Sequence, residues 1–311
     1  MGKFIIRRVA QGVLVIIAAM LVIFLALFAL GDPFSSSGDK TVPPATQEIL
    51  RAKFGMDKPL PVQFLVYLKN MFSGDLGIDF DQRRPVSEML AAALPMTVRL
   101  ALVAIIIDVL IGVIAGIIAA VWRYSFWDVL VTLLTTLAIG FPTFVIGLSL
   151  RANVTGTLMF PAVPRSAFGD QPFWLWEVLL PAFTLAIVDA AFIARLMRGS
   201  MLEVLRADYI RTARAKGLSE RKVIGKHAVR NSIIPVVTYV GIGIGALLGG
   251  AIITETIFQY QGLGLLLYKS ILNNNNPVIM AITAFGVIVF VALSLLVDIL
   301  YAFLDPRIRL S

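Results

Sequence analysis

The chain has 311 residues, of which 59% are apolar and only 15% are charged, and its mean hydropathy is +0.89. A soluble domain carries roughly 25% charged residues, so the composition excludes a soluble globular protein and a disordered chain. Cysteine is absent and His227 is the single histidine, which excludes thiol catalysis, disulfides and a multi-histidine metal site within this chain. The composition therefore indicates an integral membrane protein. Its excess of 27 Lys and Arg over 19 Asp and Glu bears first on sidedness in the membrane.

Six apolar stretches approach or exceed the length of about 20 residues that a membrane-spanning helix needs. They are residues 9–30, 100–122, 129–150, 178–194, 231–254 and 278–303. The first follows Lys3, Arg7 and Arg8, as the core of a signal peptide would. Because a signal-peptide core has roughly 7–15 residues, this longer stretch is interpreted as an uncleaved helix. The fourth helix is expected to continue past Arg195.

The distribution of charge between the loops predicts that both termini are cytoplasmic. On that arrangement the inner segments are 1–8, 123–128, 195–230 and 304–311, and they contain 16 of the 27 Lys and Arg residues. The outer loops contain ten, and Arg99 lies at a helix end. This is the positive-inside pattern of a multi-pass protein.

The first outer segment, residues 31–94, is long for a connection. Its seven basic and eight acidic residues nearly cancel. Two short amphipathic patterns, at 46–54 and 62–72, predict helices within it. We therefore expect a small folded region on the outer face, with a disordered loop as the alternative.

Three aspartates lie within the predicted spans, where a charge is costly and is a functional candidate by default. Asp298 is near the cytoplasmic end of its span, where water can solvate it. Asp108 and Asp189 are deeper. They could line the transport passage, pair with a basic group on a neighbouring helix, or remain protonated.

Proline and glycine residues inside the spans are interpreted mainly as packing features. Pro142 should kink the third span, which serves packing more often than gating. Glycines recur at four-residue spacing, typical of close helix contacts, at Gly112, Gly116, Gly241, Gly245 and Gly249. The run that begins at Gly241 follows no strand, so a dinucleotide-binding loop is the weaker interpretation.

The inner segment 199–230 has a definite pattern of two helices. Residues 207–216 favour a helix, and Gly217 follows it as glycine often follows a helix end. Ser219 is a candidate N-cap for a second helix that extends to Val229. A compact element here can dock on a cytoplasmic protein. The alternatives are topogenic charge alone and, less plausibly for so short a loop, nucleic-acid binding.

This inner segment contains the stretch Asp208-Tyr209-Ile210-Arg211-Thr212-Ala213-Arg214-Ala215-Lys216-Gly217-Leu218. It resembles the signature loop of binding-protein-dependent ABC importer permeases, in which Glu-Ala-Ala-x-x-x-Gly forms the coupling helix. Here Thr212-Ala213-Arg214 replace Glu-Ala-Ala, and Gly217 matches the glycine. The loop with this replacement resembles the version found in the dipeptide/oligopeptide/nickel branch of the family.

Further stretches resemble the same branch along nearly the whole chain. In chain order they are Arg7-Arg8, Gly31-Asp32-Pro33, Pro59-Leu60-Pro61-Val62-Gln63, Gly74-Asp75-Leu76-Gly77, Arg195-Leu196-Met197-Arg198-Gly199-Ser200-Met201 and Asp305-Pro306-Arg307-Ile308-Arg309. Each is short, but together and in this order they are specific.

The resemblance implies an all-α protein of the bacterial cytoplasmic (inner) membrane with six transmembrane helices. It implies a long extracytoplasmic segment after the first helix and a cytoplasmic coupling loop between the fourth and fifth. The implied divisions are 1–94 for the first helix and outer segment, 95–304 for the type I permease domain and 305–311 for a cytoplasmic tail.

The resemblance also implies partners: a second homologous permease, two cytoplasmic ABC ATPase domains, an extracytoplasmic substrate-binding protein and membrane lipid. The substrate class would be di- or oligopeptides, with nickel or another small solute as the alternative. The coupling contacts would come from Asp208, Tyr209, Arg211, Thr212, Ala213, Arg214, Lys216, Gly217 and Leu218. The chain contains no G-x-x-x-x-G-K-[ST] motif. We therefore expect no catalytic residue, cofactor or metal in it, and ATP with Mg²⁺ on the ATPase partners.

Two other functions stay open on the residues alone. An ion-driven secondary transporter would use Asp108 and Asp189 as proton or cation sites, although no internal repeat is evident. A membrane-embedded enzyme would need clustered catalytic groups, and the single histidine and scattered carboxylates argue against it.

Overall fold

The computed structural model describes residues 2–29, 58–79, 84–154 and 174–304. It divides the chain into two compact units, Met1–Thr97 with Gln261–Ser311, and Val98–Tyr260. The described part is almost entirely helical. We describe each unit by itself.

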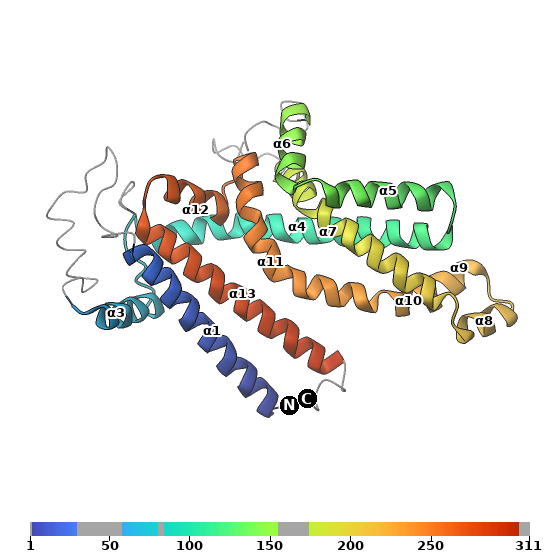
Figure 1. The fold of residues 1–311 in the computed structure, drawn as a ribbon, viewed down its shortest axis with the longest axis horizontal. Coiled ribbons are helices and arrows are strands. Elements are labelled where there is room, and N and C mark those ends of the chain that lie inside the picture. Colours follow the sequence, from blue (N-terminus) through green and yellow to red (C-terminus); the bar gives the residue numbers. More distant parts are fainter. Residues whose placement is uncertain (1, 30–57, 80–83, 155–173, 305–311) are drawn as a thin grey trace. The chain divides into compact units, whose positions relative to one another are not determined.

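The first unit is built around two long helices that lie side by side, α1 (Gly2–Ala29) and α13 (Asn276–Leu304) (Figure 1). It also contains α3 (Leu60–Phe72), the start of α4 (Val86–Val121) and α12 (Leu263–Leu272), which packs on α13. Buried side chains from α1, α3 and α13 form its core: Met20, Phe24, Tyr67, Met280 and Ala284.

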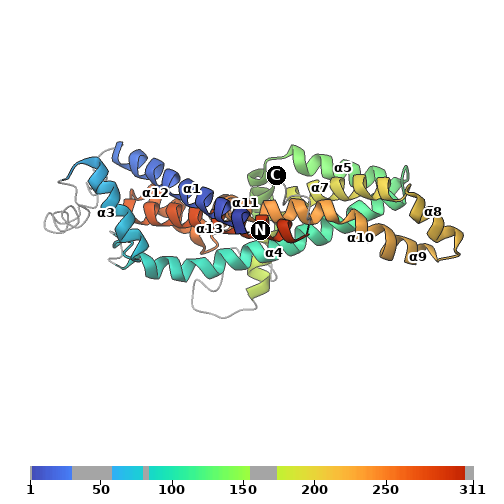
Figure 2. The same ribbon diagram turned by 90° about the horizontal axis from the view of Figure 1, so that it is seen from below.

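The second unit contains the remainder of α4 and the helices that follow it as far as Tyr260. These are α5 (Phe126–Gly140), α6 (Thr143–Val154), α7 (Trp174–Val204), α8 (Asp208–Ala215), α9 (Glu220–Lys222), the π-helix η2 (Val223–Ala228), α10 (Val229–Ser232) and α11 (Ile234–Phe258). The long helix α7 packs against α5, α6 and α11. Figure 2 shows α8 beyond the end of α7. As predicted, α7 continues past Arg195.

Four described helices are long and apolar enough to cross a membrane. Their spans are Ile5–Ala26, Val86–Val121, Leu175–Val204 and Asn276–Val297. The pair α5 and α6 makes a fifth candidate if it counts as one span. The structure thus supports a multi-pass helical protein with four or five spans among its described residues.

The predicted third span, 129–150, is interrupted at Pro142 as expected, but the result is more than a kink. The chain forms two helices, α5 and α6, bent by 101°. Phe141 between them has an extended backbone (φ −96°, ψ 133°), the conformation that a following proline favours. The single kinked helix of the prediction is therefore replaced by two separate ones.

The outer segment is described in part. The helix predicted at 62–72 is present as α3, whereas the one predicted at 46–54 lies outside the described residues. Two features of the first unit were not predicted. One is α12, and the other is a hydrogen bond from Asn275 Nδ2 to Asp79 Oδ1. Both side chains are buried, so this bond fastens the asparagine-rich turn before α13 to the chain preceding α4.

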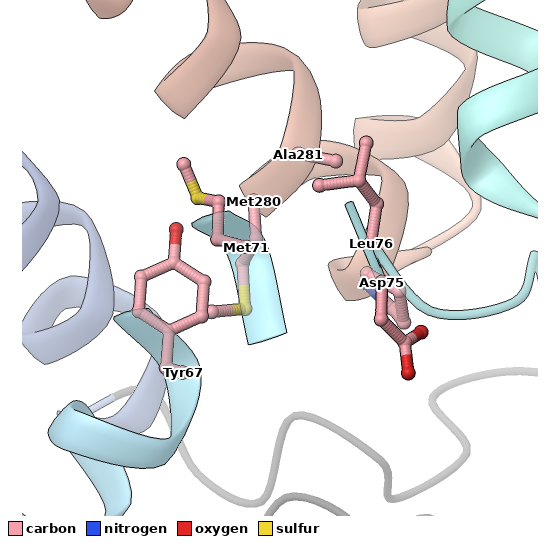
Figure 3. A pocket seen from close by; sticks show the side chains of 7 residues that line it. Tyr67, Met71, Asp75, Leu76, Met280 and Ala281 are labelled. Atoms are coloured by element: carbon pink, nitrogen blue, oxygen red, sulfur yellow. The ribbon is translucent and has the colours of Figure 1, made fainter. Parts of the chain in front are cut away.

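A cavity of about 20 Å³ lies beside the core of the first unit (Figure 3). Tyr67 of α3 lines it together with Met71 and Met280. The Tyr67 side chain is buried, and its hydroxyl has no hydrogen-bond partner among the described residues. Burial raises the pKa of Tyr67 to about 12, so the hydroxyl stays protonated.

Replacing Tyr67 with phenylalanine should leave the free energy of unfolding unchanged or raise it by about 1 kcal/mol. The substitution removes a buried polar group that makes no hydrogen bond and keeps the ring that stacks near Phe24. Thermal unfolding of the purified variant in detergent measures the change. A clear loss of stability would instead show that the hydroxyl is hydrogen-bonded, for example to a water molecule in the cavity.

Candidate functional site

The helix α8 has one buried and one exposed face. Ile210 is fully buried and Ala213 is 7% exposed. They join a cluster contributed by α4, α7, η2 and α11, whose other buried members are Ala120, Ile193, Met197, Met201, Val223, Ala228 and Val236. This cluster therefore packs α8 against the long helices α4, α7 and α11.

The opposite face of α8 is charged and exposed. Arg211 pairs with Asp208 at 3.5 Å, and both side chains are largely in solvent. Arg214 pairs with Glu220 at 2.8 Å across the following turn. Arg214 therefore joins α8 to the next helical segment as well as contributing surface charge.

The remaining sequence-predicted residues of this loop surround that face. Lys216 and Leu218 are exposed, and Thr212 donates from its hydroxyl to the Asp208 carbonyl at 3.0 Å. The Tyr209 hydroxyl accepts a hydrogen bond from Asn231 Nδ2 at 2.8 Å. Of the nine candidate coupling residues, Ala213 alone is buried.

The turn after α8 depends on a left-handed backbone at Gly217, where φ is +77°. The amide of Gly217 donates to the Arg214 carbonyl at 2.9 Å. A Cβ at this position would meet no atom within 4 Å, so the requirement for glycine is conformational and not steric. Ser219 then precedes the second helical run, but its side chain makes no capping hydrogen bond.

The second helical run continues from α9 through η2 to α10, residues 220–232. It begins where the sequence predicted a second helix and extends slightly beyond Val229. Its middle is a π-helical turn, Val223–Ala228, which the sequence did not predict. We refer to residues 208–232 as the α8–α10 segment.

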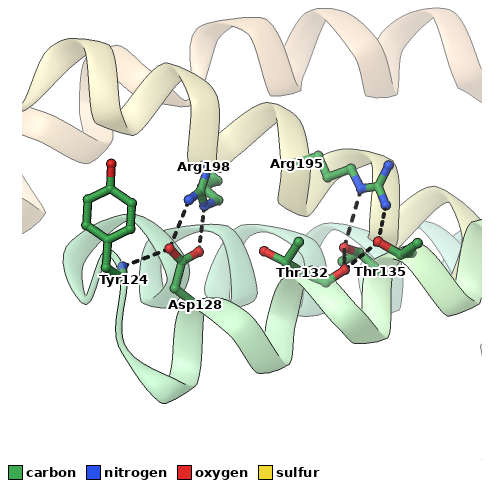
Figure 4. Close-up of polar contacts among 7 residues, drawn as sticks. Tyr124, Asp128, Thr132, Thr135, Arg195 and Arg198 are labelled. Atoms are coloured by element: carbon green, nitrogen blue, oxygen red, sulfur yellow. Dashed lines mark hydrogen bonds and ion pairs between the residues drawn. The ribbon is translucent and has the colours of Figure 1, made fainter.

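An ion pair connects the first turn of α5 to the last part of α7 (Figure 4). Arg198 donates from Nε and Nη2 to the two oxygens of Asp128, at 2.7 and 2.9 Å. Asp128 is 7% exposed as a side chain and also accepts the backbone N–H of Tyr124 at 2.9 Å. This contact also supports the positive φ of 63° at Tyr124.

A second polar contact joins the same two helices, about two turns further along α5 and one turn earlier on α7. Arg195 of α7 donates to the hydroxyls of Thr135 and Thr136 on α5, at 3.4 and 2.8 Å. Sequence analysis used Arg195 and Arg198 as positive-inside charge and as part of a stretch that resembles the family, but it assigned them no contact. One signal for the ion pair was available in the sequence. Asp128 is an acidic residue in the short segment 123–128, which was predicted to be cytoplasmic and should therefore be basic.

The two deep aspartates belong to neighbouring helices of the second unit. Asp108 on α4 is 3% exposed, and Asp189 lies on α7. The hydroxyl of Tyr239 on α11 donates to Asp189 Oδ1 at 3.0 Å. Tyr239 was missed by the sequence analysis, because a single tyrosine in an apolar helix carries no distinctive pattern.

Close packing of α4 on α7 occurs at Gly112 and Gly116. An ideal Cβ on Gly112 would lie 2.6 Å from Ile193, and one on Gly116 would lie 2.6 Å from the Ala194 carbonyl oxygen. Gly241 is half-buried in α11, whereas the surroundings of Gly245 and Gly249 lie outside the described residues, as does the Asp298 side chain.

Among the described residues, no group of three His, Cys, Asp or Glu side chains is placed to hold a metal ion. A charged, exposed helix is anchored to the ends of long apolar helices, and polar contacts join those helices to one another.

Two family models match the chain. Residues 112–310 match the "Binding-protein-dependent transport system inner membrane component" family, and residues 1–101 match its N-terminal region. The chain belongs to this family. It is accordingly a permease subunit of an ABC importer, a non-catalytic membrane component whose ATPase is a separate subunit.

Full-length relatives agree with the family models. A Brucella abortus protein, provisionally named a peptide transport system permease, is 39% identical over 99% of both chains. The oligopeptide transport system permease protein AppB of Bacillus subtilis is 36% identical over 99% of this chain and 100% of its own length. The glutathione transport system permease protein GsiC of Pectobacterium atrosepticum is 37% identical over 99% of both chains.

A solved structure supports the fold. The crystal structure of an amino acid ABC transporter with histidines aligns with a TM-score of 0.51 at 16% identity, over 69% of this chain and 93% of that one. At this identity the likeness concerns the helical fold alone.

Proposed function

We propose that this permease forms, with a second homologous permease, the passage by which di- or oligopeptides enter a bacterial cytoplasm. An extracytoplasmic binding protein delivers the peptide, and two ATPase domains carry ATP and Mg²⁺. The names of the relatives, which specify peptide, oligopeptide and glutathione systems, support this substrate class.

The observation that carries the proposal is the two-faced α8. Its buried face, Ile210 and Ala213, is continuous with the core of α7 and α11, and its exposed face carries Arg211, with exposed Lys216 directly after the helix. A cytoplasmic ATPase that moves this face thereby moves two long helices, which is how ATP binding would switch the passage between outward and inward access.

The proposed topology has six spans with both termini cytoplasmic, α11 being the fifth span and the α5–α6 pair the third. Residues 1–94, 95–304 and 305–311 then form the outer-facing start, the permease domain and the tail. Because the chain lacks cysteine, single substitutions give unique labelling sites. With a membrane-impermeant maleimide on intact cells, Leu60→Cys should react and Arg211→Cys should not. The reverse pattern would overturn the orientation.

Affinity purification of the tagged permease from membranes in mild detergent tests the partners. We expect two ATPase polypeptides or domains and a second permease to co-purify, and a binding protein to join when peptide is added. Ligand released from that binding protein identifies the substrate by mass spectrometry. Recovery of this chain alone, under conditions that keep known importers intact, would contradict the proposal.

Replacing Gly217 with valine should reduce peptide-stimulated ATP hydrolysis by the reconstituted importer at least several-fold. A β-branched residue resists the left-handed conformation by about 1–2 kcal/mol, so the turn that orients α8 is distorted. Gly217→Asn is the matched control, since asparagine tolerates this conformation, and it should retain most of the activity. Both variants should co-purify with the permease partner. Equal activity of the two would show that the turn does not orient α8 for coupling.

A further inference from the structure

The contacts between α4 and α7 place Asp108 opposite Asp189. Gly112 lies against Ala190 and Ile193, and Gly116 lies one turn later against Ala194 and Met197. The two helices therefore run in the same direction. A step of four residues along α4, from Gly112 to Gly116, corresponds to a step of four residues along α7, from Ala190 to Ala194. One turn before Gly112 is Asp108, and the register puts it against the α7 turn that contains Asp189.

The third member of the cluster comes from α11. The Tyr239 hydroxyl donates to Asp189 Oδ1, and the Tyr239 ring lies 6.3 Å from that of Phe192 on α7. Asp108 Oδ1 is buried and has no hydrogen-bond partner in the described structure. The cluster thus joins α4, α7 and α11 and contains one unsatisfied carboxyl oxygen.

Within the described part of the chain, neither carboxyl forms an ion pair. Arg195, the nearest basic residue along α7, donates to Thr135 and Thr136 of α5, and Arg198 binds Asp128. On α6, Arg151 donates to the Ile257 carbonyl. The titratable side chains that face the pair are therefore those of the cluster itself: Asp108 from α4, Asp189 from α7 and Tyr239 from α11.

Two unpaired carboxylates on facing membrane helices would repel each other and would both be poorly solvated. A single proton removes that repulsion and supplies the missing hydrogen-bond donor. Asp189 already accepts a hydrogen bond from Tyr239, which stabilises its ionised form, whereas Asp108 is the more buried of the two and its Oδ1 has no hydrogen-bond partner. The proton consequently belongs on Asp108.

We propose that Asp108, Asp189 and Tyr239 form a proton-binding site between α4, α7 and α11, with the proton on Asp108 and the negative charge on Asp189. The site is distinct from the α8 surface and does not depend on the proposed substrate. By holding three helices together, the bound proton stabilises the second unit. Because the unfolded chain releases this proton at neutral pH, stability falls as the pH rises until the folded protein also releases it.

Infrared spectroscopy of the purified permease in lipid nanodiscs detects the proton, because a carboxylic acid has a C=O stretching band that a carboxylate lacks. At neutral pH we expect a buried carboxylic-acid band in the wild type that disappears in Asp108→Asn. Asp208→Asn is the matched control, since that side chain is 95% exposed, and it should keep the band. A spectrum of Asp108→Asn that retains the whole band would overturn the assignment.

Thermal unfolding provides a second readout that does not require the variant to fold. The wild-type melting temperature should fall by on the order of 3 °C from mildly acidic to mildly alkaline buffer. A wild-type melting temperature that is constant over this range would overturn the proposal. The proposal would also be overturned by a melting temperature that rises on addition of sodium and does not depend on pH. That result would assign the site to a metal cation. Asp108→Asn, in which a neutral amide replaces the acid, should lose the pH-dependent component.

Discussion

Replacing Gly116 with leucine should prevent the segment Val98–Tyr260 from folding stably, with an expected loss of at least about 3 kcal/mol. The Cβ alone would lie 2.6 Å from the Ala194 carbonyl oxygen and from the Met197 Cβ. One of these contacts is backbone, which cannot rotate away, so α4 and α7 must separate. Size-exclusion chromatography of the solubilised variant and its thermal unfolding measure the loss.

Gly286→Leu is the matched control for this substitution. Gly286 lies in α13, is exposed, and would have no atom within 4 Å of an added Cβ. The control should give wild-type yield and melting temperature. If Gly116→Leu gave the same yield and melting temperature as Gly286→Leu, the close approach of α4 and α7 at Gly116 would be contradicted.

Replacing Asp128 with alanine should destabilise the permease by about 2 kcal/mol, because the ion pair that it breaks is partly buried, with the Arg198 side chain 31% exposed and the Asp128 side chain 7% exposed. The change leaves the Arg198 guanidinium without its two carboxylate contacts and the Tyr124 amide without its acceptor. Asp128 also lies in the first turn of α5, where a negative charge is favourable. The unfolding free energy in detergent and urea measures the effect.

A double-mutant cycle separates the ion pair from the other roles of Asp128. Asp128→Ala combined with Arg198→Ala should be less destabilising than the sum of the two single changes by about 1–3 kcal/mol, because no charge is then left unpaired. Asp208→Ala, which breaks the exposed pair with Arg211, serves as the control and should cost less than about 1 kcal/mol. Strict additivity of Asp128→Ala and Arg198→Ala would mean that the pair contributes no coupling.

The sequence predicted a multi-pass helical protein, because membrane thickness constrains the length of apolar helices directly, and four or five of the six predicted spans are supported among the described residues. It also located the interruption at Pro142 and the glycine after α8, where local backbone chemistry decides the conformation. It did not anticipate that α4 begins at Val86, before the apolar stretch, since Pro95 lies within the helix without ending it. In that case the tertiary structure outweighed a local helix-breaking signal.

The polar contacts between helices were not predictable from local pattern. Arg198 and Asp128 are 70 positions apart, and Tyr239 and Asp189 are 50 apart. Sequence analysis identified the aspartates as costly but could not name their neighbours, because the partner depends on helix register. For Asp108 and Asp189, that register becomes evident from the close approaches of α4 and α7 at Gly112 and Gly116.

The π-helical turn in the α8–α10 segment keeps the buried residues before and after it on the same side of the helix. Val223 and Ala228, five residues apart across this turn, are both fully buried. Ser232 and Val236 follow at the four-residue spacing of an α-helix and are buried too. The π-helical turn contains one residue more than an α-helical turn would. The additional residue lies among exposed positions such as Gly225 and Lys226. The five-residue spacing across this turn therefore keeps Val223 and Ala228 on one buried face, together with Ser232 and Val236.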